Sequence, residues 1–277
     1  MSETNLLKLD INDKNFSIIR DIRKNVFTGE LGILESELFD EHDKVCDHFI
    51  IFDGKNAVGV VRFVQINQDI KLERMAILQE FRTKNHGKNC ISQLREYYQL
   101  GARFAKWRAV ITIGESEPSS ACISANAHAL ARYAALCQEN DIVPIVEPEI
   151  LMDGTHTIEE SFVLTEEVLH TVFYELYGQD VLYEGMVLKP NMVLSGYKSS
   201  EQAIVEDVAE MTVTALKRSV PAAVPGIAFL SGGQSDEDAT AHLNAMNQIL
   251  GENSPWNLTY SFGRALQAPA LKAWDGE

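Results

Sequence analysis

The sequence predicts an α/β protein in which a hairpin-rich front segment precedes a longer run of alternating strands and helices. In the front segment, two apolar runs flank the turn at residues 53–56, whose Asp53-Gly54 dipeptide is typical of a β-hairpin. From residue 106 onward, short apolar stretches alternate with longer stretches of helical periodicity. Because the later strands are almost continuously apolar, we expect a parallel sheet that is covered by helices.

The front segment is expected to hold one helix and three strands. Residues 16–27 have helical periodicity, with Ile18, Ile19, Ile22 and Val26 on one face. The predicted strands are 48–53, 57–66 and 70–78, and a loop at 82–87 leads into a helix at 88–105. No low-complexity linker follows, so the two segments are predicted to meet inside that helix.

The second segment repeats one pattern of strand and helix. Predicted strands cover 107–113, 142–149, 182–190, 225–233 and 257–265. Predicted helices cover 119–139, 158–177, 202–219 and 236–250. Repeats of this kind make right-handed parallel crossovers, which indicates part of a (β/α) barrel.

Composition limits the classes of function. The chain has 277 residues and a formal net charge of −16, which argues against a nucleic-acid partner. An anionic substrate would need a local positive pocket against this overall charge. Four widely spaced cysteines without a C-x-x-C pair argue against disulfides and against a metal site. No apolar run is long enough for a membrane span and the N-terminus lacks a signal layout, so we expect a cytoplasmic protein without a membrane partner.

Polar residues stand at the ends of the predicted barrel strands, where barrels carry their catalytic groups. Lys189 follows the apolar run 186–188, and burial would disfavour its charged form and free the amine to attack a carbonyl. Lysines at strand ends more often extend to the surface. Glu147 and Glu149 on the neighbouring strand favour the reactive interpretation, because they could hold the ammonium and relay protons.

Two glycine-containing segments follow the last two predicted strands. They are Ser231-Gly232-Gly233 and Gly263-Arg264. Loops at these places in a barrel commonly bind phosphate through backbone N–H groups, and arginine adds a forked charge. Either segment alone could be an ordinary turn, but the pair indicates a phosphate site.

The segment VLYEGMVLKPN at 181–191 resembles the active-site signature of class I fructose-bisphosphate aldolases, with Val187 where that family has leucine or serine. Segments 104–110, 143–151, 221–235 and 259–267 are similar to the family in order and spacing. The resemblance implies that Lys189 forms an imine with a keto-phosphate, Glu147 relays protons, Glu149 orders the lysine cluster and Lys106 lies beside the imine. It also implies that Arg108 binds the second phosphate, and that the first is bound by Ser231, Gly232, Gly233, Gly263 and Arg264.

The same resemblance implies the substrates and cofactors. Fructose 1,6-bisphosphate and dihydroxyacetone phosphate are the expected sugar-phosphate ligands. No metal or cofactor is required, because the protonated imine is the electron sink that a metal supplies in other aldolases.

The resemblance covers only the last five of eight barrel strands. The first three strands, with an aspartate and a lysine, have no counterpart, and neither have the final helix and C-terminal tail. Activity is therefore expected to be impaired. The open sheet edges could also lead to oligomers.

Residues 1–94 resemble the first half of a GNAT N-acetyltransferase. The features that carry this resemblance are a helix, an acidic segment at 35–45, a hairpin and the segment ERMAILQEFRTKNHGKNCI at 73–91. The resemblance implies a mixed sheet and an acetyl-CoA site at Arg82, Asn85 and Gly87. Asn85 stands where that family has its first glycine. Asparagine tolerates left-handed backbone geometry, but its side chain would crowd the phosphate.

The predicted organisation is thus a GNAT-like half-domain at 1–94, joined through a shared helix to a partial (β/α) TIM barrel with parallel strands at 95–277. We interpret the chain as a chimera, natural or engineered. An impaired aldolase-type lyase is the leading hypothesis. A non-catalytic hybrid and an acyl-CoA-binding protein are the alternatives.

Overall fold

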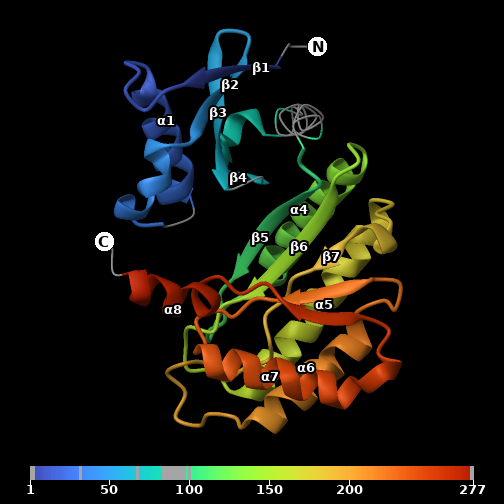
Figure 1. The fold of residues 1–277 in the computed structure, drawn as a ribbon. Coiled ribbons are helices and arrows are strands. Elements are labelled where there is room, and N and C mark those ends of the chain that lie inside the picture. The colour runs from blue at the N-terminus through green and yellow to red at the C-terminus, as the bar shows by residue number, and fades with distance from the viewer. Residues whose placement is uncertain are drawn as a thin grey trace. The chain divides into compact units, whose positions relative to one another are not determined.

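A computed structural model describes residues 4–30, 33–66, 69–82, 86, 98 and 101–274 (Figure 1). The chain divides into two compact units, Met1–Ala105 with Glu139–Ile142, and Lys106–Gln138 with Val143–Glu277. The described strands form one sheet of four strands and one of five. The predicted join between residues 94 and 95 lies outside the described residues.

The first unit holds a sheet in the order β1-β2-β3-β4. Its strands are β1 (Thr4–Leu9), β2 (Asp47–Asp53), β3 (Asn56–Ile66) and β4 (Asp69–Ile77). The hairpin is confirmed, since Asp53 pairs with Asn56 across the turn. Strand β1 was not predicted from the sequence. All described pairs of this sheet are antiparallel, so the predicted mixed sheet has no parallel pair among the described residues.

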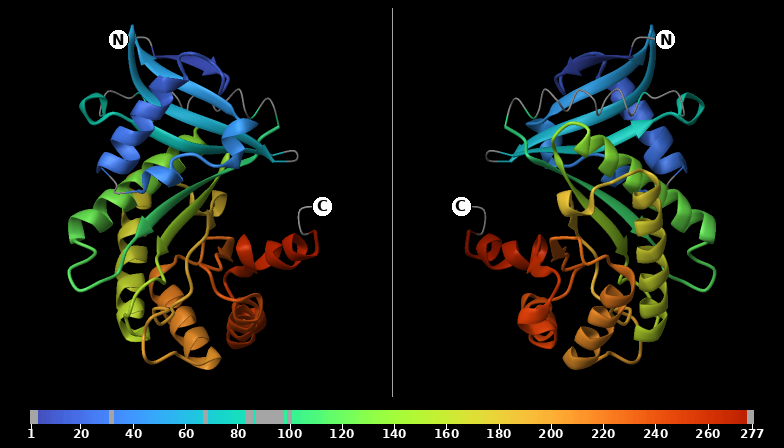
Figure 2. Two further views of the ribbon diagram at one scale, coloured as in Figure 1. Left: turned by 90° about the vertical axis from the view of Figure 1, so that its left-hand side faces the viewer. Right: turned by 90° about the vertical axis from the view of Figure 1, so that its right-hand side faces the viewer.

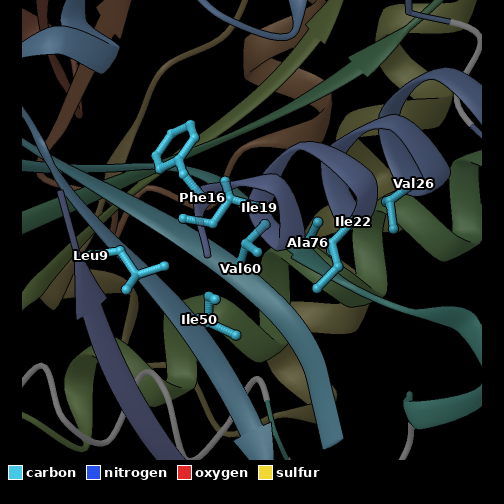
Figure 3. Close-up of a cluster of buried hydrophobic side chains, with 8 residues drawn as sticks. All are labelled: Leu9, Phe16, Ile19, Ile22, Val26, Ile50, Val60 and Ala76. Carbon is cyan, nitrogen blue, oxygen red and sulfur yellow. The ribbon is translucent and has the colours of Figure 1, made fainter. Parts of the chain in front are cut away.

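Helix α1 (Phe16–Arg23) covers one face of this sheet and continues as a π-helical segment, Lys24–Glu30. Short 3-10 helices follow at Glu35–Glu37 and Glu41–Lys44. Figure 3 shows the cluster that the helix makes with the strands: Leu9, Phe16, Ile19, Ile22, Val26, Ile50, Val60 and Ala76. The predicted apolar face is therefore confirmed, with Phe16 in the core and Ile18 only partly buried. Each large apolar side chain buried here contributes about 1.5–3 kcal/mol.

The second unit alternates strands and helices, as predicted. Its strands are β5 (Phe104–Ile111), β6 (Val143–Ile150), β7 (Val187–Leu188), β8 (Gly226–Phe229) and β9 (Asn257–Tyr260). Its helices are α4 (Ser120–Gln138), α5 (Ile158–Gly178), α6 (Val205–Ser219), α7 (Asp236–Leu250) and α8 (Arg264–Trp274). The sheet order is β5-β6-β7-β8-β9, with parallel pairs from β6 to β9.

The helices follow one another in chain order beside this sheet (Figure 2). Helix α4 packs against β6 and α5, α5 packs against α6, and α6 packs against α7. This order follows from the strand–helix repeat, because each crossover helix returns to the same side of a twisted sheet. Among the described residues, no helix combines the length and apolar character that crossing a membrane requires.

Several predicted boundaries are wrong. The predicted helix at 88–105 overlaps β5, which already begins at Phe104, and most of the remaining predicted helix lies outside the described residues. The strand predicted at 182–190 shrinks to Val187–Leu188, preceded by a 3-10 helix at Tyr183–Gly185. Pro190 lacks the N–H that a longer strand would need. The last strand ends at Tyr260, and α8 follows where no helix was expected, with Pro269 inside it.

Candidate active site

Three neighbouring strands bring the predicted catalytic residues to one place in the second unit. Side chains two residues apart share a face of a strand, so Lys106 and Arg108 lie together on β5. The same rule places Glu147 and Glu149 together on β6. Val146 pairs with Leu188, and the N–H of Lys189 bonds the Val146 carbonyl at 2.8 Å. This register sets Lys189 beside Glu147.

Glu147 lies between two ammonium groups. Its Oε1 is 3.0 Å from Lys189 Nζ, and its Oε2 is 2.8 Å from Lys106 Nζ. The Glu147 side chain is 4% exposed and that of Lys189 is 14% exposed. A partly exposed amine keeps access to a ligand, while a carboxylate within hydrogen-bond reach can take up or return its protons.

Glu149 has a different partner from the one expected. Its carboxylate forms an ion pair with Nε of Arg108. The hydrogen bond with Glu149 is also the main cause of a raised pKa at Arg108. Of the two glutamates that were predicted to hold the lysine, only Glu147 contacts Lys189 among the described contacts.

The charges of this group favour an anionic ligand. Three cations, Lys106, Arg108 and Lys189, meet two carboxylates, so the group is formally positive by one charge. The chain as a whole carries −16. A local reversal of sign is what a phosphate ester needs in order to bind to so acidic a protein.

The Ser231-Gly232-Gly233 loop follows β8 and lies next to the lysine segment, since Leu230 N–H bonds the Pro190 carbonyl at 3.2 Å. Gly232 and Gly233 have φ of +63° and +103°. A Cβ at Gly232 would stand 2.5 Å from the methyl carbon of Met152. The backbone angle favours glycine at position 232, and a Cβ there would have to displace the end of the buried Met152 side chain.

The second predicted phosphate segment adjoins the first. Ser261 N–H bonds the Phe229 carbonyl at 2.8 Å, which brings the end of β9 to the end of β8. Gly263 precedes α8, and Arg264 is the first residue of that helix. The predicted phosphate contacts of Gly263 and Arg264 stay predictions.

Three residues around the loop were not predicted from the sequence: Tyr197, Gln234 and His242. Gln234 and His242 are buried, and Tyr197 lies in the long connection after β7. Only Gln234 carried a signal, because it directly follows the glycine pair. Tyr197 is 35 positions from Gly232 in the sequence, whereas His242, on α7, is only eight positions from Gln234. Neither has a local sequence signal that links it to the loop.

The predicted acetyl-CoA residues fall in the first unit, and two of them, Asn85 and Gly87, lie outside the described residues. Arg82 is described. Its Nη2 is 2.6 Å from Glu30, and its Nε donates to the Ile77 carbonyl at 2.9 Å. These contacts engage its guanidinium within the protein, and a role in coenzyme binding stays a prediction.

One group in the first unit has the residue types of a metal site. Ligand atoms of Asp43, Cys46 and His48 lie within 4.8 Å of one another. Both Asp43 oxygens, however, are 2.7 Å from an arginine, Arg23 or Arg62. Two guanidinium charges at this distance repel a cation, so this group does not suit a metal ion.

The family of the chain is established by comparison with known proteins. A sequence profile described as fructose-bisphosphate aldolase class-I matches residues 42–277, which is most of the chain. The chain therefore belongs to the class I fructose-bisphosphate aldolase family.

Individual relatives agree. A protein of Xanthomonas campestris named "Probable fructose-bisphosphate aldolase class 1" is 61% identical over 183 residues, which cover 66% of this chain and 54% of that protein. The fructose-bisphosphate aldolase of Dictyostelium discoideum is 42% identical over 283 residues, covering 98% of this chain and 76% of that protein. An aldolase structure from Plasmodium falciparum, in complex with TRAP and an inhibitor, matches with a TM-score of 0.66 and 44% identity. That match covers 78% of this chain and 59% of the solved one.

The coverage of these matches differs between the two parts of the chain. The chain spans about half the length of the Xanthomonas relative. The family profile and the Dictyostelium match both extend into residues 1–94, the segment predicted to be a separate half-domain. The structure of an N-acetyltransferase from Lactobacillus plantarum matches with a TM-score of only 0.32 and 18% identity, which is too low to carry an argument.

Proposed function

We propose that this chain forms a Schiff base between Lys189 and the ketone of a sugar phosphate, and that it makes or breaks the adjacent C–C bond as a fructose-bisphosphate aldolase does. The observation that carries the proposal is the Lys189–Glu147–Lys106 contact, with distances of 3.0 Å and 2.8 Å at the central carboxylate. A nucleophilic amine beside a buried acid–base group is the arrangement that imine chemistry needs.

Each step has a group that can perform it. Glu147 takes up a proton from the Lys189 ammonium group, the neutral amine attacks the ketone carbon, and Glu147 returns the proton to the oxygen that leaves as water. The resulting imine carries a positive charge. When the neighbouring hydroxyl group loses its proton, the C–C bond breaks and an aldehyde is released, while the electron pair of that bond moves into the imine to give an enamine. Protonation of the enamine carbon restores the imine, and water hydrolyses it to the ketone and the free amine of Lys189. Chemistry of this class requires no cofactor, because the protonated imine accepts the electrons.

We assign the first phosphate to the loop after β8, together with Gly263 and Arg264. Arg108 is the proposed contact for the second phosphate. The ion pair with Glu149 holds the guanidinium group of Arg108 in place. The formal positive charge of the group supports both assignments. Fructose 1,6-bisphosphate and dihydroxyacetone phosphate are the proposed ligands.

Borohydride trapping tests the proposal. Reduction in the presence of dihydroxyacetone phosphate should add the mass of one reduced triose phosphate to the chain, and peptide mapping should place it on Lys189. Lys189→Ala should abolish the adduct, whereas Lys217→Ala, on α6, should retain it. An adduct of equal yield in Lys189→Ala would refute the assignment.

We also propose that residues 1–94 are a GNAT-like half-domain joined to a partial barrel at 95–277. The order of one strand, one helix and three antiparallel strands in the first unit supports this. Titration calorimetry with acetyl-CoA tests its function. Heat that is unchanged by Lys189→Ala would support coenzyme binding, and its absence in the intact chain would count against it.

Two further proposals concern the whole protein. A cytosolic location agrees with the name of one relative, the cytosolic fructose-bisphosphate aldolase 5 of Arabidopsis thaliana, which is 59% identical over 186 residues. Association through the sheet edges is testable by sedimentation velocity.

A further inference from the structure

The carbonyl groups of the loop after β8 are held by residues outside the proposed catalytic set. The Ser231 carbonyl accepts two hydrogen bonds from Gln234, one from side-chain Nε2 at 2.9 Å and one from the backbone N–H at 3.0 Å. The Gly232 carbonyl accepts one from the hydroxyl of Tyr197 at 3.1 Å. Two successive peptide groups are therefore anchored by their oxygens.

Anchoring these oxygens also sets the direction of the N–H groups. A trans peptide is planar, so its N–H points opposite to its carbonyl. With the oxygens of Ser231 and Gly232 turned toward Gln234 and Tyr197, the N–H groups of Gly232 and Gly233 are directed the other way. Within the described part of the chain, neither N–H donates to a backbone acceptor. Two successive N–H groups of this kind form a concave site for an anion.

His242 in turn determines how the Gln234 amide is oriented. A carbonyl oxygen can only accept, so the nitrogen of the Gln234 amide must face Ser231. The amide oxygen then faces His242, whose Nδ1 is 2.7 Å away and must carry the hydrogen. Gln234 and His242 are 9% and 7% exposed, so water competes little for these bonds. Loss of either partner would leave a buried polar group unsatisfied.

Tyr197 joins the loops that follow three neighbouring strands. It comes after β7, its N–H bonds the carbonyl of Met152 after β6 at 2.9 Å, and its hydroxyl reaches Gly232 after β8. The hydroxyl is also 3.3 Å from the sulfur of Met152. Met152 packs against Gly232 so closely that a Cβ there would clash. Tyr197 and Met152 therefore both restrict the position of Gly232.

We propose that Tyr197, Gln234 and His242 are positioning residues that direct the N–H groups of Gly232 and Gly233 at the phosphate of a bound keto-phosphate. This inference rests on the proposed function for the identity of the ligand. The bonds that carry it run to the loop and not to Lys189 or Glu147, so the three residues act on phosphate affinity and not on imine formation itself.

The experiment compares ligands with and without a phosphate. Borohydride trapping at Lys189 is measured as a function of concentration with dihydroxyacetone phosphate and with dihydroxyacetone, and inorganic phosphate binding is measured by calorimetry. The variants are Tyr197→Phe, Gln234→Met and His242→Leu. His242→Asn is the conservative partner, because the amide nitrogen of asparagine lies near the place of Nδ1. Tyr174→Phe, on the exposed surface of α5, is the matched control for Tyr197→Phe.

The three disruptive variants should raise the half-saturating concentration of dihydroxyacetone phosphate about three- to tenfold, which corresponds to one hydrogen bond each. Saturation with dihydroxyacetone should not change, and phosphate binding should weaken by the same factor. His242→Asn should restore most of the loss, and Tyr174→Phe should show none. A merely structural role would affect both ligands equally, and that result would overturn the inference.

The outcome also separates this inference from the proposed function. If the unaltered chain binds phosphate and the variants weaken that binding, but no adduct forms at Lys189, the proposed function fails and the positioning role stands. If adducts form but the variants leave the preference for the phosphate ligand unchanged, the positioning role fails alone. The absence of phosphate binding and of any phosphate preference in the unaltered chain would overturn the inference as well.

Discussion

At the scale of single residues, Glu147 is the group on which the candidate site depends. It is buried, and it is the only carboxylate among the described contacts of Lys189. Glu149 has the same side chain and lies two residues away, yet it pairs with Arg108. The two glutamates should therefore respond differently to substitution, although their sequence positions are similar.

Glu147→Gln keeps the size of the side chain and removes the charge and the basic oxygen. We expect trapping of dihydroxyacetone phosphate at Lys189 to slow by at least about 100-fold, the usual contribution of a positioned acid–base group. The rate of adduct formation by mass spectrometry is the measurement. Glu175→Gln makes the same chemical change at a surface pair with His128 and should leave the rate unaltered. Equal rates in the two variants would contradict the role of Glu147.

Gly232 offers a test with an internal reference. Gly232 and Gly251 have nearly the same φ, +63° and +59°, but only at Gly232 would a Cβ meet a neighbour, Met152. Gly251, with ψ of −158°, lies in a backbone region that is nearly restricted to glycine, so Gly251→Ala should cost about 1–3 kcal/mol of unfolding free energy from the backbone conformation alone. Gly232→Ala should add about 1–3 kcal/mol from overpacking, and it should also weaken phosphate binding. Chemical denaturation measures the first effect and calorimetry the second. Identical losses of stability would show that Met152 moves aside freely.

At the scale of elements, the first unit is organised around a buried ionic cluster. Arg62 is buried and contacts Asp40, Asp43 and Glu73. Arg62 thereby links β3 and β4 to the 3-10 segment Glu41–Lys44 that Asp40 caps. Removal of one partner from such a cluster leaves an uncompensated buried charge, so the cluster should control the stability of this unit.

Acid should therefore destabilise the first unit. Hydrogen bonds from Arg62 hold the pKa of Asp40 below its usual value. Burial alone would raise the pKa of Asp43, but hydrogen bonds from the Asp40 N–H and Arg23 outweigh it and lower the pKa. Carboxyls with lowered pKa stabilise the folded state above their unfolded value of about 4, and this contribution is lost as the pH falls further. The denaturation midpoint should fall as the pH is lowered from about 4 to about 2. The change of the midpoint with pH should be smaller in Arg62→Met. A midpoint that is constant over this range would contradict the expectation.

At the scale of the whole molecule, the two compact units provide separate spectroscopic signals. The three tryptophans, at positions 107, 256 and 274, all belong to the second unit. If the units unfold independently, tryptophan fluorescence should follow the second unit alone, while far-UV circular dichroism should follow both. We expect Arg62→Met to shift one transition seen by circular dichroism and to leave the fluorescence midpoint in place. Coincident midpoints that move together would show one cooperative unit instead.

Much of the fold could be predicted from the sequence, because strand and helix periods are local properties of the chain. The hairpin at residues 53–56, the apolar face of α1 and the parallel strand–helix repeat all followed from them. The failures lie where a local pattern is ambiguous. Residues 182–190 are apolar enough for a strand, but Pro190 and a 3-10 helix limit the strand to two residues. Helix α8 was not predicted, and it contains Pro269, a residue type that disfavours the interior of a helix.

The family and the candidate residues could be identified without a structure. Parallel strands end at one edge, so Lys189 and the loop at 231–233, which follow β7 and β8, gather there. The predicted residues of β5 and β6 instead lie within their strands. Which of these groups meet was decided in three dimensions. The fold placed Glu147 between Lys189 and Lys106, gave Glu149 to Arg108, and brought Tyr197, Gln234 and His242 around the loop at 231–233. Apart from the short-range contacts of Gln234 with Ser231 and His242, these contacts join residues 35 or more positions apart. They depend on the register between strands and on how the connecting loops fold back, and neither has a local signal in the chain.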